Sequence, residues 1–198
     1  GMAEKPQLGN IKYVDKNGDG ILNENDVVML HDGIPDFTGG LNNTFKFKGF
    51  DLGIYTYGML GRKANNGYIN FLNPTAISDK IYPSNTITEI KNVWSSDNQN
   101  GIYPGLSQTS NPYNGANPTG VNDFWLMDAS FIRIKNLTFG YTLPDNLAKK
   151  MKINLLRVFV DFQNLYTITS FKGIDPEITE QNPYPQALSS TIGINVSF

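Results

Sequence analysis

An acidic loop near the start of the chain has the residue types and the spacing of a calcium-binding loop. Oxygen-bearing residues recur at positions 1, 3, 5, 9 and 12 of a stretch that begins at Asp15. Gly20 stands at position 6, where such loops turn sharply, and position 7 supplies a backbone carbonyl. Calcium is a hard cation that prefers oxygen ligands of this kind. The expected ligands are Asp15, Asn17, Asp19, the carbonyl oxygen of Ile21, Asn23 and Asp26.

The predicted loop departs from the usual pattern at its last position, where Asp26 replaces a bidentate Glu. The shorter side chain would bind through one oxygen, or the loop would close more tightly. No pair of long amphipathic helices flanks the loop, so the pattern favours a structural calcium over a sensor. The alternative is a solvated turn held by Asn and Asp side chains.

Four aromatic residues lie in or beside a long polar segment and are candidates for ligand contact. Exposed aromatic rings stack on sugars, although such residues also pack loops or mark a membrane interface. The candidates are Trp94, Tyr103, Tyr113 and Trp125.

The sequence offers little for catalysis. His31 is the only histidine, and no nucleophile elbow of the Gly-x-Ser-x-Gly type occurs. Asp175 and Glu177 flank Pro176, which predicts a turn rather than an acid–base pair. The chain has no cysteine, which excludes disulfides and thiolate zinc sites, and its net charge of −2 provides no basic field for nucleic acid. We therefore expect neither an enzyme nor a nucleic-acid-binding protein.

The elements around these residues are predicted to be strands, because apolar and polar residues alternate in several segments. The clearest is the last, where Ile192, Ile194, Val196 and Phe198 alternate with small or polar residues. Strands of a transmembrane β-barrel need this pattern, since one face meets lipid and the other meets the lumen. Phe198, an aromatic residue at the end of the last strand, is also a candidate signal for barrel assembly.

Other alternating segments run over residues 44–48, 50–54, 131–141 and 156–163. Lys48 and Gly49 predict a tight hairpin turn, and the phase change at Tyr55 predicts a bulge near Ile54 and Tyr55. The long connections, 60–128 and 167–187, fall on one side of these strands and the short ones on the other, which is typical of outer-membrane barrels. The predicted organisation is an outer loop with the acidic loop over 1–36, a β-hairpin over 37–59, a long polar outer loop over 60–128 and barrel strands over 129–198.

Seven stretches together resemble the closing section of the SusC/RagA-type TonB-dependent outer-membrane transporters. They cover nearly the whole chain except residues 60–122. They are NIKYVDKNGDG over residues 10–20, GIPDF over 33–37, KGFDL over 48–52, FWLMDASFIRIKNLTFGYTLP over 124–144, LRVFV over 156–160, QNL over 163–165 and GIDPE over 173–177, followed by the terminal strand.

The resemblance implies a barrel of about 22 strands with an N-terminal plug, located in the outer membrane of a Gram-negative bacterium. It also implies import of glycans or peptides, a SusD-like surface lipoprotein as partner and energy supplied through TonB. This chain would be an isolated C-terminal fragment of the barrel, all-β and antiparallel, with long outer loops and too few strands to close. Its partners would be the rest of the barrel, the plug and outer-membrane lipid.

A second hypothesis is a soluble β-sandwich that binds carbohydrate through loop aromatics and holds one structural calcium. Detergent dependence distinguishes the two, because a soluble module should stay monomeric without detergent. A hydrolase is a distant third hypothesis.

Overall fold

A computed structural model describes residues 8–31, 33–65, 88–105, 123–124, 126–178 and 184–198. The chain divides into two compact units, one of residues 1–32 and 65–126 and one of residues 33–64 and 127–198. Among the described residues, no helix has the length and the apolar character needed to cross a membrane.

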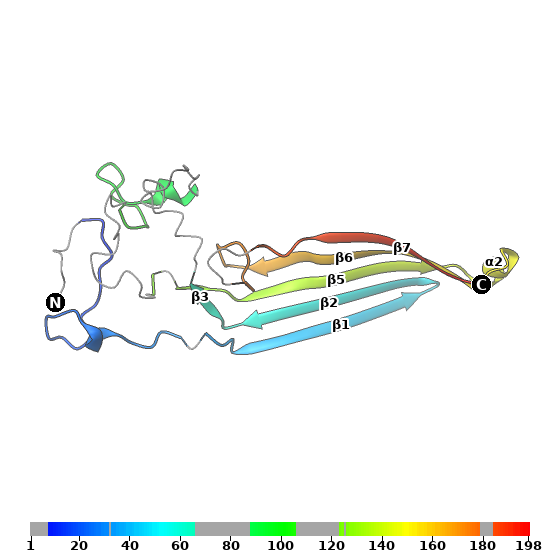
Figure 1. Cartoon of the computed structure of the whole chain (residues 1–198), viewed down its shortest axis with the longest axis horizontal. Helices are drawn as coiled ribbons and strands as arrows, with labels where there is room; N and C mark the ends of the chain where they lie inside the picture. The colour runs from blue at the N-terminus through cyan, green and yellow to red at the C-terminus, as the bar shows by residue number, and fades with distance from the viewer. Residues whose placement is uncertain (1–7, 32, 66–87, 106–122, 125, 179–183) are drawn as a thin grey trace. The chain divides into compact units, whose positions relative to one another are not determined.

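The second unit is built on one open antiparallel sheet of five strands in the order β1-β2-β5-β6-β7 (Figure 1). This confirms the all-β, antiparallel prediction. Neither edge strand, β1 or β7, has an outer neighbour in the described part of the chain. The strands are β1 (Phe37–Phe47), β2 (Phe50–Leu60), β5 (Phe131–Thr142), β6 (Leu155–Thr169) and β7 (Ser189–Ser197).

Short connections lie at one end of this sheet. Lys48 and Gly49 join β1 to β2 and have φ angles of 46° and 88°, which matches the two-residue turns that follow strand twist. The other short connection carries the helix α2 (Asp145–Lys150), between β5 and β6. The chains from β2 to β5 and from β6 to β7 leave from the opposite end (Figure 1). The predicted hairpin turn and the predicted sorting of connections are both confirmed.

A β-bulge interrupts the middle of the sheet. The register of β2 against β5 shifts between Tyr55 and Thr56, and Lys135 is the residue of β5 left without a partner. The register of β5 against β6 shifts at the same place, between Ile134 and Asn136. The prediction of a bulge near Ile54 and Tyr55 is confirmed in position, with the extra residue on β5.

The register divides the sheet into an apolar face and a polar face, because paired residues of neighbouring strands point the same way. Val158 pairs with Ile194, and Val160 with Ile192, on the apolar face. Ile192 is 81% exposed, so nothing in the described part of the chain covers this face. A sandwich buries such a face against a second sheet, and the described residues provide only a two-stranded sheet of β3 (Lys63–Asn65) and β4 (Leu126–Asp128).

The first unit consists mainly of loops. The 3₁₀ turn η1 (Glu24–Asp26) forms the end of the acidic loop, and a second, η3 (Thr88–Asn92), precedes an isolated bridge between Val93 and Tyr103. Both bridge residues are buried, so they form a small local core.

Candidate functional site

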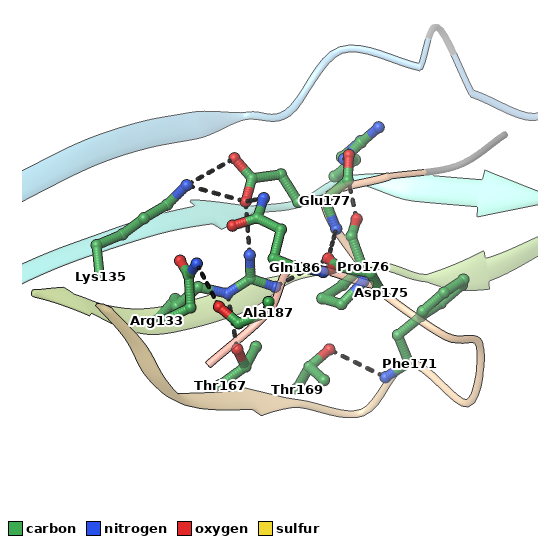
Figure 2. Close-up of polar contacts among 12 residues, drawn as sticks. Arg133, Lys135, Thr167, Thr169, Phe171, Asp175, Pro176, Glu177, Gln186 and Ala187 are labelled. Atoms are coloured by element: carbon green, nitrogen blue, oxygen red, sulfur yellow. Dashed lines mark hydrogen bonds and ion pairs between the residues drawn. The ribbon is translucent and has the colours of Figure 1, made fainter. Parts of the chain in front are cut away.

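The polar face of the five-stranded sheet carries the densest group of interacting charges in the described residues. We call this group the Arg133 cluster (Figure 2). It comes from strands β5 and β6 and from the segment that follows β6. Its members are Arg133, Lys135, Thr167, Asp175, Glu177 and Gln186.

Arg133 is the hub of this cluster. Its NH2 lies 2.8 Å from Asp175 Oδ1, its NH1 lies 2.8 Å from Glu177 Oε2, and its Nε donates to Thr167 Oγ1 at 2.7 Å. The residue is only 3% exposed. All three sides of the guanidinium are therefore engaged, as a buried charge requires.

A second set of contacts joins the same segment to the sheet. Lys135 Nζ lies 3.1 Å from both carboxylate oxygens of Glu177, and Gln186 Nε2 donates to Glu177 Oε2 at 2.7 Å. Arg62 NH1 donates to the carbonyl oxygens of Pro176 and Glu177, at 2.9 and 3.1 Å. Side chains from three places in the chain thus hold the turn at residues 173–177 against the polar face.

Two cationic side chains of the cluster also lie over aromatic rings. The Arg133 guanidinium lies 5.2 Å from the ring centre of Phe131, and Lys135 Nζ lies 5.3 Å from that of Tyr57. Phe131 is the largest fully buried side chain of the described residues. The cluster therefore lies beside a fully buried aromatic side chain of the second unit.

Asp175 is nearly fully buried, and its environment favours the charged form. Burial raises the pKa of this carboxyl, but the hydrogen bonds from Arg133 and from the Glu177 backbone outweigh it and hold the pKa below its usual value. A carboxylate of this kind stabilises the fold above its unfolded-state pKa, and the contribution is lost as pH falls through the lower folded-state pKa.

Further along the polar face, Arg157 of β6 and Asp51 of β2 form a bidentate ion pair across β5, the strand between them. Arg157 Nε lies 2.9 Å from Asp51 Oδ1, and NH2 lies 2.5 Å from Oδ2. Gly140 stands between the partners, and a Cβ there would fall 2.7 Å from Asp51 Oδ1. The glycine therefore makes room for the pair. The face has hydrogen-bonded and ion-paired groups suited to an aqueous lining.

The acidic loop folds around its own side chains. Asp15 accepts hydrogen bonds from the backbone of Gly18 and Gly20, at 2.6 and 2.7 Å. Asp19 Oδ1 accepts from Ile21 at 2.7 Å, and Asp26 accepts from Lys16 and from Asn23, at 2.8 and 2.9 Å. Backbone hydrogen bonds, above all from Asn23, hold the pKa of Asp26 below its usual value.

The side chains of the acidic loop are not arranged around a common point where a cation could bind. No group of three or more acidic or histidine side chains converges on one point in the described part of the chain. Each carboxylate oxygen that accepts an amide still has a lone pair, so Asp15, Asp19 and Asp26 could ligate calcium after small side-chain rotations. The calcium site, with Asn17, the Ile21 carbonyl and Asn23 as its other ligands, stays a prediction.

Two of the four candidate aromatics are built into the first unit. The Trp94 ring packs against Gly9 and Gly105, where a Cβ would collide with it or crowd it. Tyr103 is 7% exposed, and burial raises the pKa of its hydroxyl. Tyr113 and Trp125 lie outside the described residues. Sugar contact through these residues stays a prediction.

Phe198 follows β7 and is 88% exposed, so the structure leaves its ring available to lipid or to another protein. Sequence reasoning missed Arg133 and Lys135 and interpreted Asp175 and Glu177 as a simple turn. The available signal was a pair of cationic residues at the bulge of a strand otherwise apolar or neutral.

No protein-family model matches the chain. TonB-dependent receptor P3 of Formosa agariphila is 29% identical to it over 187 residues, which are 94% of this chain and 17% of the receptor. TonB-dependent receptor SusC of Bacteroides thetaiotaomicron is 28% identical over 191 residues, again 94% of this chain and 17% of the receptor. The chain thus spans about a fifth of the length of the curated relatives it matches.

Solved structures agree with the sequence comparison. A structure of the RagAB peptide transporter superposes with a TM-score of 0.65 at 29% identity, over 83% of this chain and 17% of that one. The 'open-open' state of the RagAB peptide importer gives a TM-score of 0.60 at 28% identity. With its open antiparallel sheet, the chain is similar over most of its length to part of the SusC/RagA-type TonB-dependent receptors.

Proposed function

We propose that this chain forms part of the barrel wall of a TonB-dependent nutrient importer in the outer membrane of a Gram-negative bacterium. The observation that carries the proposal is the division of one sheet into two faces. Val158, Ile192 and Ile194 lie exposed on one face, and Arg133, Asp161 and Arg157 lie on the other. Lipid would contact the first face and the aqueous lumen the second.

Strand length supports the same assignment. A transmembrane β-strand needs about 9–11 residues when tilted. The strands β1 and β2 have 11 residues each, β5 has 12 and β6 has 15. All four are long enough to cross the hydrocarbon layer. The open edges at β1 and β7 would pair with the remaining strands of the barrel, because an unpaired edge in lipid leaves backbone groups unsatisfied.

The imported substrate is a glycan or a peptide, and the partners are a SusD-like surface lipoprotein and TonB. Relationship to SusC and to the RagAB peptide importer supports this proposal. The Arg133 cluster would hold the turn at residues 173–177 against the lumen wall, beside the end where the long outer connections begin. Its role is to fix the shape of that wall.

Topology provides the test. In cells that carry the full-length protein, an epitope tag inserted at Asn114, in the long connection outside the described residues, should bind antibody on intact cells. A matched tag at Asn146, in α2, should bind antibody only after the outer membrane is opened. The proposed orientation places the long connections outside the cell and the short ones in the periplasm. The reverse pattern would contradict this orientation, and equal access of both tags in intact cells would contradict membrane insertion.

A further inference from the structure

The end of the sheet with the short connections carries a group of exposed lysines that we call the basic rim. Lys48 lies in the β1–β2 turn, and the others lie in and directly after α2. None forms an ion pair within the described part of the chain. The basic rim consists of Lys48, Lys149, Lys150 and Lys152.

The helix α2 presents apolar side chains beside these lysines. Leu147 and Met151 are 47% and 60% exposed and are four residues apart, which places them on the same side of a helix. Ala148 is the buried residue of α2 and faces the protein. The segment is fixed to the sheet, because Asn154 donates to the Ser197 carbonyl oxygen at 2.7 Å. Exposed apolar and cationic groups thus share one short, anchored element.

Aromatic rings cluster on the apolar face near the end of the sheet that carries the basic rim, and they indicate where this end would lie in a membrane. The ring of Phe50 lies 4.6 Å from that of Tyr141 and 5.8 Å from that of Phe139, centre to centre. Lys48 Nζ lies 5.2 Å from the ring centre of Phe47. Aromatic girdles of membrane barrels lie at the boundary between hydrocarbon and headgroups. The lysines next to them would therefore stand at headgroup level.

We propose that the basic rim binds the anionic headgroups of phospholipids in the adjacent leaflet, with Leu147 and Met151 inserted among the acyl chains. The inference rests on the proposed membrane insertion. Charge complementarity supports it, since Asp51, an acidic side chain near this end, is already paired with Arg157, while the four lysines form no ion pair within the described residues. Lysines at an interface attract anionic lipid, and their stems accommodate apolar surroundings.

The test uses the full-length protein in nanodiscs with equal amounts of phosphatidylglycerol and phosphatidylcholine. Lipids retained by the protein are counted by native mass spectrometry. The variant replaces Lys149, Lys150 and Lys152 with Gln. The matched control replaces Lys12, Lys16 and Lys91, three exposed lysines of the other unit, with Gln. Circular dichroism of each variant checks that the β-structure is retained.

Wild type and the control should retain phosphatidylglycerol over phosphatidylcholine by at least about fivefold, and the rim variant should lose most of this preference. Addition of salt to wild type should weaken the preference, because headgroup attraction is screened. An inserted barrel whose preference is equal in wild type and the rim variant would overturn the proposal. Lower outer-membrane levels of the rim variant with an unchanged lipid preference would overturn it in favour of a protein partner. Failure of wild type to insert at all would instead contradict the proposed function.

Discussion

At the scale of single residues, Arg133 shows how the fold stabilises a buried charge. Its guanidinium contacts Asp175 and Glu177, which lie 42 and 44 residues further along the chain. Breaking a buried ion pair by removing one partner is costly, because the other charge is left uncompensated. The cluster therefore couples the turn at residues 173–177 to β5.

Replacement of Arg133 with Met should release that turn. Two carboxylates would remain against the polar face without their main partner, and the cost should be about 3–5 kcal/mol. Hydrogen–deuterium exchange of residues 171–178 in the full-length protein should rise sharply at neutral pH. Lys135→Met is the matched control, since Lys135 is more exposed and contacts Glu177 alone among the carboxylates of the cluster. Equal exchange in wild type and Arg133→Met would contradict the role of Arg133.

Acid should loosen the same turn. The pKa of Asp175 is lowered in the folded state, so its stabilising contribution is complete above the ordinary value of about 3.9 and is lost below it. Exchange of residues 171–178 should change little between pH 5 and 8 from this cause and should increase as pH drops below 4. The Asp175→Asn variant should lack this acid-induced increase. An identical acid response in that variant would show that another group is responsible.

The acidic loop yields a second residue-scale prediction. If Asp15, Asp19 and Asp26 ligate calcium, Asp19→Ala should abolish binding and loosen residues 10–31. Isothermal titration with calcium measures the first effect, and protease sensitivity at 10–31 measures the second. Asp97→Ala, an exposed aspartate of the same unit, is the control. If the wild-type loop neither binds millimolar calcium nor changes its protease sensitivity in calcium, the calcium prediction is wrong and the loop is a solvated turn held by Asn and Asp side chains.

At the scale of elements, local pattern predicted the strands well, because a strand with one apolar and one polar face must alternate. The residue types of Lys48 and Gly49 predicted the turn. At Tyr55 the alternation of apolar and polar residues changes phase, and this change predicted the bulge. The bulged residue itself, Lys135, lies on a strand distant in sequence, so one strand could not reveal it. The Arg133 cluster was hidden for the same reason, since its partners are far apart in sequence.

The final strand carries its own prediction through Phe198. Its ring is exposed beside an unpaired edge, which is suited to recognition by an assembly factor that pairs with strand edges. Phe198→Ala in the full-length protein should sharply lower outer-membrane levels while synthesis continues. A residue that only belongs to the aromatic girdle should cost about 2 kcal/mol and leave assembly intact. Normal surface levels in the variant would therefore support the girdle role alone.

At the scale of the whole molecule, the 198-residue chain by itself leaves an apolar face and two strand edges uncovered within its described part. Surfaces of this kind promote association in water. The isolated chain should form oligomers in detergent-free buffer and disperse in mild detergent, as measured by light scattering. A stable monomer without detergent, with Phe45 and Ile192 still solvated, would contradict this expectation.

The most direct test of the membrane-wall assignment uses the absence of cysteine from the chain. Single cysteines are placed in turn along β6 and β7 of the full-length protein in lipid bilayers, after any cysteine outside this chain has been replaced with Ser, and each is challenged with a water-soluble thiol reagent. Positions Val158, Val160 and Ile192 should be protected, and their neighbours Asp161, Thr191 and Asn195 should react. Reaction at every position, without this two-residue period, would contradict a sheet that separates lipid from an aqueous lumen.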